Sequence, residues 1–314
     1  MRIFITGATG FLGSYVTEFL VSQGAEVAVL LRESSHPWRL EVVWSPIQKI
    51  IGDLSMISRW RKEVADFAPD TIIHLGWHGV AGSDRNDPQQ IEQNLDSSIA
   101  LVRLARECEC SAFIGLGSQA EYGPCNRKVD ETNCCMPTTL YGATKLSICH
   151  LGRVTLLGSP TRFTWLRLFS SYGPRDNPGW MIPSLINQLL EGKKPALTKC
   201  EQKWDYLYVE DAAEAICRVA FSPNTTGIFN LGSGLAVSLR EVVELVRDAI
   251  DSRLPLGFGE VPYRPDQVMH LQADINHLQH EVLWQPTTSI AEGLKKTISF
   301  FRARMKENIA IGRG

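Results

Sequence analysis

The N-terminal segment RIFITGATGFLG (residues 2–13) joins a short apolar run directly to a glycine pattern. The run RIFIT is typical of a buried β-strand, and Gly7, Gly10 and Gly13 follow it and open a helical pattern. Glycine lets the backbone turn tightly and approach a pyrophosphate, which then meets the free N–H groups and positive end of the helix. The segment therefore predicts a dinucleotide-binding turn, with a ligand-free glycine turn as the alternative.

Further short apolar runs lie at residues 26–32, 71–77, 112–117 and 163–169, and helical patterns such as 15–23 and 99–108 separate them. Strands that alternate with helices predict an α/β fold, a Rossmann-type doubly wound parallel sheet with helices on both faces. Beyond residue 170, loops rich in proline and glycine separate shorter elements. We expect a dinucleotide-binding domain over 1–169, to which 205–232 returns, and a smaller α/β substrate-binding lid domain over 170–314.

The composition excludes several classes of partner. The 314 residues carry a net charge of −2 without long runs of one sign, so we expect no nucleic acid and no membrane, but a small molecule. The chain lacks a signal-peptide pattern at Met1, which favours a cytoplasmic protein. Its eight cysteines lack the spacing of a disulfide framework or a zinc site. Reduced thiols and no metal are expected.

The stretch TLYGATKLS (residues 139–147) places Tyr141 and Lys145 four positions apart, on one face of a helix. An ammonium about 4 Å from a phenolate stabilises it by roughly 4 kcal/mol at an effective dielectric near 20, so we expect the lysine to lower the pKa of the tyrosine. Ser118 follows the run at 112–117, where ligands of an open parallel sheet bind. A tyrosine with a lowered pKa can exchange a proton closer to neutral pH, and the Ser118 hydroxyl can hydrogen-bond a reacting oxygen.

The end of the second strand bears on the choice of dinucleotide. A carboxylate there would favour NAD, whereas Leu31 and Arg32 stand at this position and Glu33 falls beyond it. We therefore expect NADP, with Arg32 and a hydroxyl from Ser34 or Ser35 on its 2′-phosphate. A solvated arginine and NAD are the alternative.

Several motifs in order along nearly the whole chain carry a family resemblance. To the glycine turn, Ser118 and the Tyr/Lys pair they add HLGWHG (74–79), LRLFSSYGP (166–174), DYLYVEDAAEAI (205–216), FNLGSG (229–234) and LWQPTTSIAEGL (283–294). Together they resemble the extended short-chain dehydrogenase/reductases, the NAD-dependent epimerase/dehydratase family that acts on nucleoside-diphosphate sugars. The resemblance implies a nicotinamide cofactor, a nucleotide-sugar substrate and a homodimer.

The resemblance also implies residue roles. The implied catalytic residues are Ser118, Tyr141, Lys145 and Asn94. The tyrosine would exchange a proton with the sugar, the lysine would hold the nicotinamide ribose, and the asparagine would support that lysine through the helix backbone. Asp53 would meet the adenine amino group. The full set of implied cofactor-binding residues is Gly7, Thr9, Gly10, Phe11, Leu12, Gly13, Arg32, Ser34, Asp53, Leu54, Leu75, Gly76, Trp77, Tyr141 and Lys145.

Positions at which the sequence departs from the family pattern limit the reactions that we expect. Family 4,6-dehydratases carry an Asp-Glu pair after the hydroxyl residue, whereas Gln119 and Ala120 stand here; Glu121 is one position late and would face the other way on a strand. The C-terminal patterns FGEVPYRPDQVM (258–269) and ADINHL (273–278) look most like 4-keto-6-deoxyhexose reductases. The sequence thus favours NADPH-dependent reduction of a nucleotide-linked 4-keto-6-deoxyhexose. An NAD-dependent nucleotide-sugar 4-epimerase and a non-catalytic cofactor sensor remain alternatives.

The predicted substrate contacts rest on the same resemblance. Arg264 matches a family arginine that grips the diphosphate, and Lys203 could supplement it. Trp204 replaces a family arginine and either stacks on the nucleobase or fills the lid core. The complete predicted set is Gln119, Glu121, Ser170, Lys203, Trp204 and Arg264.

Overall fold

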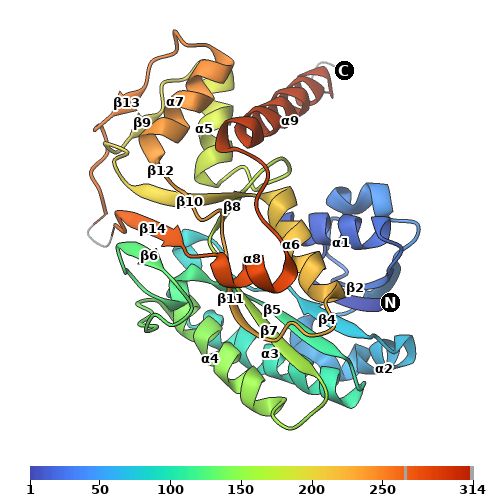
Figure 1. Cartoon of the computed structure of the whole chain (residues 1–314). Coiled ribbons are helices and arrows are strands. Elements are labelled where there is room, and N and C mark those ends of the chain that lie inside the picture. The colour runs from blue at the N-terminus through green and yellow to red at the C-terminus, as the bar shows by residue number, and fades with distance from the viewer. Residues whose placement is uncertain (265–266, 312–314) are drawn as a thin grey trace.

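The computed structural model describes residues 1–264 and 267–311 (Figure 1). Residues 265 and 266 of the predicted YRPD motif, and the last three residues of the predicted lid domain, lie outside the described residues. No helix of the described residues is long and apolar enough to cross a membrane.

A seven-stranded sheet with the order β11-β7-β5-β4-β1-β2-β3 forms the centre of the larger part, and its neighbouring strands are parallel. The predicted Rossmann-type fold is confirmed, and each of the five predicted strands is present. The sequence patterns did not single out β3 and β11. In chain order the strands are β1 (Arg2–Thr6), β2 (Glu26–Leu31), β3 (Gln48–Ile51), β4 (Thr71–His74), β5 (Ala112–Ser118), β7 (Arg162–Leu168) and β11 (Gly227–Leu231).

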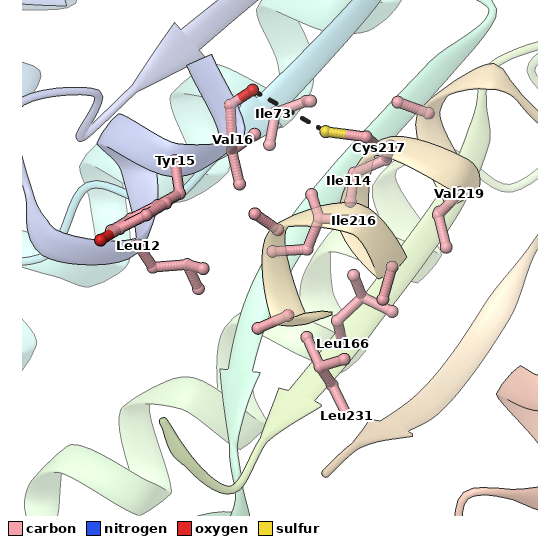
Figure 2. Close-up of a cluster of buried hydrophobic side chains, with 14 of the residues drawn as sticks. Leu12, Tyr15, Val16, Ile73, Ile114, Leu166, Ile216, Cys217, Val219 and Leu231 are labelled. Atoms are coloured by element: carbon pink, nitrogen blue, oxygen red, sulfur yellow. Dashed lines mark hydrogen bonds between the residues drawn. The ribbon is translucent and has the colours of Figure 1, made fainter. Parts of the chain in front are cut away.

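Successive side chains of a strand point to opposite faces of the sheet, so apolar residues lie on both faces. Helices cover each of the two faces. Ile3 and Ile5 join one buried cluster with residues of α1 (Phe11–Ser22) and α6 (Val209–Phe221), whereas Phe4 joins the cluster on the other face. In Figure 2, α1 and α6 lie together over the strands, and the Cys217 thiol of α6 lies 3.7 Å from the Val16 carbonyl of α1. The opposite face carries α2 (Ile57–Phe67), α3 (Gln89–Glu107) and α4 (Leu140–Thr155).

The smaller part contains a second sheet with the order β12-β10-β14-β6, to which β8 adds by pairing with β10. Its apolar residues form a separate core with α5, α7 and α9, which lie together at the top of Figure 1. The elements are β6 (Arg127–Val129), β8 (Ser170–Tyr172), α5 (Met181–Leu190), β9 (Ala196–Leu197), β10 (Lys203–Tyr208), β12 (Ala236–Ser238), α7 (Leu239–Ile250), β13 (Gly257–Phe258), β14 (His270–Ala273) and α9 (Ile290–Ile311). The helix α8 (Asn276–Val282) instead packs against the main sheet, where Leu278 joins the cluster of Ile3 and Ile5.

Two strands pair in a different sheet from the one that the predicted domain limits imply. β11 lies in the main sheet, but β10, which the prediction returned to the first domain, lies in the second sheet. β6, inside the predicted first domain, also pairs in the second sheet, with β14. β6 is the short segment RKV, whose sequence shows no apolar alternation, so no pattern separated it from the first domain.

Candidate active site

The glycine turn lies at the carboxyl end of β1, where the strand order reverses between β1 and β4. Such a reversal is the usual binding crevice of an open parallel sheet. Gly10 caps α1 without a side-chain hydrogen bond, and no acidic residue stands in the first turn. A Cβ on Gly7, at φ 78°, would lie 2.5 Å from Gly76 N, and one on Gly13 would lie 2.1 Å from Gly7 O. The turn thus combines a bare backbone with a positive helix end, which fits a dinucleotide pyrophosphate.

The loops around this turn bring other predicted cofactor residues together. Gly76 is so close to Leu54 that an added Cβ would lie 2.9 Å from the Leu54 methyl group. The Thr9 carbonyl accepts a hydrogen bond from Arg39 Nη1 at 3.3 Å. No sequence pattern pointed to Arg39. Leu12 is buried in the core beneath the turn, while Phe11 and Leu75 are half-buried beside it.

The end of β2 carries the residues predicted to choose the dinucleotide. Leu31 is buried and Arg32 and Ser34 are exposed, while the Ser35 hydroxyl accepts the Arg32 N–H at 3.1 Å. Asp53 caps the next short helical turn, where hydrogen bonds from Ser55 lower the pKa of its carboxyl and the Arg32 charge adds to the effect. Arg32 and Asp53 therefore share one edge of the sheet, on the side of the glycine turn.

Tyr141 and Lys145 lie in the first turns of α4, and Trp77 contacts both. The Trp77 ring meets the Tyr141 ring edge-on at 5.6 Å between centroids, and Lys145 Nζ lies 3.7 Å from the Trp77 ring centroid. The ammonium donates to the Leu116 carbonyl of β5 at 2.5 Å. The helix begins at Thr139, whose hydroxyl accepts the Gly142 N–H. The lysine is thus fixed between β5 and the loop after β4.

Burial sets the protonation of this pair. It lowers the pKa of Lys145 to about 7, against an opposing effect of Glu121, and it raises the pKa of Tyr141. The Ser118 hydroxyl and the Arg85 guanidinium oppose the shift of Tyr141. The expectation that Lys145 lowers the tyrosine pKa is therefore wrong for this structure, because the ammonium is drawn to Leu116 and Trp77 and stays 5.9 Å from the Tyr141 ring centroid.

Ser118 ends β5 and starts a short 3-10 turn, Gln119–Glu121, rather than a continuing strand. Its hydroxyl accepts the Ala120 N–H at 3.2 Å and lies near the Tyr141 phenol. Gln119 stays half-buried, but Glu121 turns inward and is fully buried. Its carboxylate accepts hydrogen bonds from Ser118 N, Trp165 Nε1 and Arg167 Nε. The prediction that Glu121 contacts substrate is therefore wrong, because its carboxylate is buried and accepts hydrogen bonds from the protein itself.

The Asn94 side chain binds the backbone of the loop after β4 and of its own helix. Its side chain accepts the His78 N–H at 2.8 Å and donates to the carbonyls of His78 and Gln90. It therefore fixes the loop after β4, including the neighbourhood of Trp77, and makes no hydrogen bond to Lys145 within the described residues. The implied support of the lysine through the helix backbone stays a prediction.

Four of the predicted substrate residues, Ser170, Lys203, Trp204 and Arg264, belong to the smaller part. Ser170 pairs with Tyr206 between β8 and β10, and Lys203 and Arg264 are exposed. Trp204 packs against two hydrophobic clusters and donates its indole N–H to the Val268 carbonyl at 3.1 Å. Of its two predicted roles, filling the lid core is the one that these contacts support.

Two arginines of the site went unrecognised in the sequence. The Arg85 guanidinium lies 5.4 Å from the Tyr141 ring centroid, and the Arg85 carbonyl accepts the Tyr141 N–H. It stands in an irregular loop that offers no periodic signal. Arg167 did carry a signal, because an arginine inside the apolar run FTWLRLF needs a buried partner. That partner is Glu121, at 2.8 Å.

The perturbed lysine gives a stability prediction. Folded Lys145 releases its proton at about pH 7, against an ordinary 10.5, so between these values the unfolded chain binds more protons and wild-type stability rises with pH. Below pH 7 the full cost of burying the ammonium remains. Lys145→Met is therefore expected to be more stable than the wild type below pH 7, with a gain that shrinks toward pH 10.5. Urea unfolding across this range measures it; parallel pH curves for the two proteins would contradict the assignment.

The chain is similar to known enzymes in sequence and in fold. The chain is 27% identical to the uncharacterized UDP-glucose epimerase YtcB of Bacillus subtilis, over 96% of this chain and 98% of the relative. It is 26% identical to dTDP-glucose 4,6-dehydratase of Salmonella typhimurium, over 96% and 93%. The UDP-glucose 4-epimerase of Thermus thermophilus, solved in complex with NAD, superimposes with a TM-score of 0.85 at 26% identity, over 96% and 99% of the two chains.

The family model of the NAD dependent epimerase/dehydratase family matches residues 3–232. This match runs from the first strand of the main sheet to the last, and it includes the glycine turn, Ser118 and the Tyr141/Lys145 pair. We conclude that the chain belongs to the NAD-dependent epimerase/dehydratase family of enzymes, as its motifs predicted.

Proposed function

We propose that the chain is a nucleotide-sugar 4-epimerase, which inverts the C4 hydroxyl of a nucleoside-diphosphate hexose by oxidation and reduction at that carbon. The observation that carries this proposal is the convergence of the Tyr141 phenol, the Ser118 hydroxyl and the Lys145 ammonium beside the glycine turn. The similarity to UDP-sugar epimerases, including one solved with NAD, supports epimerisation over the ketone reduction that the sequence patterns favoured.

Tyr141 and Ser118 have different roles in the proposed proton transfer. Tyr141 takes the proton of the C4 hydroxyl and gives it back, and Ser118 hydrogen-bonds the same oxygen. Because burial keeps the phenol protonated, Arg85 and Ser118 have to offset burial when the tyrosine acts as a base. Trp77 and the Leu116 carbonyl hold Lys145 in its place beside them.

The dinucleotide would be held by the glycine turn, the loop 75–77, the Arg32 and Asp53 edge, and Lys145. When bound, it supplies the acceptor and donor for the hydride of the sugar C4 carbon. The arginine at residue 264 is proposed to meet the diphosphate of the substrate, with Lys203 beside it. The homodimer stays a prediction, which sedimentation would test.

Dehydration is disfavoured by the residues that follow Ser118, despite the similarity to a dTDP-glucose 4,6-dehydratase. Elimination of water needs an acid and a base next to the sugar, and Gln119 and Ala120 provide neither. The carboxylate of Glu121 is buried and already accepts three hydrogen bonds.

A second candidate is NADPH-dependent reduction of a nucleotide-linked 4-keto-6-deoxyhexose, favoured by Arg32 and by the buried Leu31 where a carboxylate would bind the ribose of NAD. A contact of Arg32 with a 2′-phosphate would be worth about 1.5 to 3 kcal/mol, so this enzyme would prefer NADPH at least about tenfold. The double variant Leu31→Asp/Arg32→Asn would then lose that preference. Equal wild-type use of the two dinucleotides would remove this candidate.

The state of the purified protein separates the candidates. An epimerase that regenerates its dinucleotide in every cycle is expected to carry NAD or NADH in about stoichiometric amount after extensive dialysis. A reductase exchanges its dinucleotide in each turnover and is expected to lose it. Acid extraction followed by chromatography of the released nucleotides distinguishes them. A chain that holds a dinucleotide but converts no sugar of either class would instead support a cofactor sensor.

A further inference from the structure

A closed group of charged and polar side chains lies directly behind Ser118 and plays no part in the chemistry proposed above. Its centre is the Glu121–Arg167 ion pair, whose side chains are 0% and 3% exposed. Glu121 Oε1 accepts the Ser118 N–H at 2.8 Å and the Trp165 indole N–H at 3.0 Å, and Oε2 accepts Arg167 Nε at 2.8 Å. The carboxylate therefore has a donor on each side and no exposure to solvent.

The end of β5 is shaped to admit this carboxylate. A Cβ on Gly117 would lie 2.5 Å from Glu121 Oε1 and 2.2 Å from Trp165 Nε1, so only glycine leaves room for both at this position. The Ser118 hydroxyl and the Glu121 carboxylate also form a reciprocal capping box around the short turn. The backbone that carries the Ser118 hydroxyl is thus held from both ends of one turn.

Trp165 lies near both this carboxylate, to which it donates its indole N–H, and Lys145. Lys145 Nζ lies 6.0 Å from the Trp165 ring centroid, and its hydrogen-bond acceptor, Leu116, precedes Gly117 on β5. The Arg167 guanidinium lies instead over the Tyr122 ring, at 4.5 Å from its centroid. The two charged groups therefore contact different aromatic rings, and Lys145 lies near the ring that binds the carboxylate.

Among the residues whose side chains the structure describes, the other titratable groups beside Lys145 are His74 and Tyr141, and neither offers it a negative charge. His74 of β4 is fully enclosed, and burial lowers its pKa to about 3, so it is neutral. Burial raises the pKa of Tyr141, on the same helix as the lysine, so it is also neutral. Burial lowers the pKa of Lys145, and Glu121 is the group that opposes this effect.

We propose that Glu121 is a positioning residue of the active site: its carboxylate fixes the backbone of Ser118 and provides the counter-charge of the buried Lys145 ammonium. Arg167 compensates the carboxylate on its far side, so that a buried negative charge can be kept there. This inference rests on the proposed function in giving Ser118 and Lys145 their roles, but the contacts themselves do not depend on which sugar is converted.

The double variant Glu121→Gln/Arg167→Met tests the proposal. A single Glu121→Gln change would leave the Arg167 charge buried and unpaired, which can unfold the protein, whereas the double change removes both charges. The glutamine keeps a carbonyl oxygen for Ser118 and Trp165. The titration of Lys145 is followed by NMR of protein labelled with ¹³C at lysine Cε, with the signal assigned from Lys145→Met. We expect the pKa of Lys145 to fall by about one pH unit below its wild-type value. An unchanged value would overturn the proposal.

Asp211→Asn is the matched control. Asp211 is also a buried carboxylate with three hydrogen bonds, from Thr287 N, Thr287 Oγ1 and Thr288 N, but it stands on α6 and its hydrogen bonds are to the segment before α9. We expect it to lower the melting temperature and to leave the titration of Lys145 unchanged. An equal shift in both variants would mean a general loosening of the fold and would also overturn the proposal. The titration needs no substrate, so a wild type that converts no sugar would contradict only the proposed function.

Discussion

Tyr141→Phe is expected to lower kcat by about 10² to 10⁴-fold, the usual contribution of a general acid or base, with little change in dinucleotide affinity. The variant lacks only the phenolic oxygen. Its ring keeps the edge contact with Trp77 and the position beside Arg85, at 5.6 and 5.4 Å, so the fold and the cofactor turn are preserved. Initial rates at saturating sugar and a binding titration with the dinucleotide measure the two quantities separately.

Tyr172→Phe is the control for this change. Tyr172 is buried in the core of the smaller part, where its hydroxyl donates to the Ile290 carbonyl at 3.4 Å. Its loss is expected to cost some stability and no catalytic rate. If Tyr141→Phe kept near-wild-type turnover, the assignment of proton transfer to this phenol would be wrong.

Gly13→Ala is expected to weaken dinucleotide binding by about five- to 150-fold. The added methyl group would lie 2.1 Å from the Gly7 carbonyl oxygen, and it meets backbone rather than a movable side chain. The turn has to open to relieve the contact, and overpacking of this kind costs about 1 to 3 kcal/mol. Isothermal titration with NAD and NADP measures the loss, and circular dichroism checks that the fold is retained.

Gly179→Ala provides the comparison, because the nearest atom to its added methyl group would be Asn177 Oδ1 at 3.4 Å, an ordinary contact. It is expected to bind the dinucleotide as the wild type does. Wild-type affinity in Gly13→Ala would show that the pyrophosphate does not lie against this turn.

The features that the sequence predicted correctly depend on local spacing. Three glycines between a strand and a helix can serve few purposes, and residues four apart on a helix share a face whatever surrounds them. The Tyr141/Lys145 pair and the glycine turn therefore needed no knowledge of the tertiary contacts. The assignment to the family followed from several such local patterns in a fixed order.

The wrong predictions concern side chains whose direction depends on the local backbone conformation or on a partner distant in sequence. Glu121 was predicted to contact substrate, whereas a 3-10 turn directs its carboxylate to Arg167, 46 positions away in sequence. The lysine was expected to lower the pKa of the phenol, but burial raises that pKa, and the ammonium is held at Leu116 and Trp77 by tertiary contacts that the sequence does not show. Arg85 reaches Tyr141 from a loop whose course no periodicity predicts.

The most direct test of the central claim uses a nucleoside-diphosphate hexose that carries deuterium at C4. The purified protein, without added dinucleotide, is incubated with the uridine, thymidine, cytidine and guanosine diphosphate sugars, and the products are analysed by NMR. The account predicts that one of them is converted to an equilibrium mixture of its C4 epimers, with deuterium retained at C4 and no net change in nicotinamide absorbance. The absence of any C4 epimer, together with stoichiometric oxidation of NADPH by a nucleotide-linked 4-keto sugar, would contradict it.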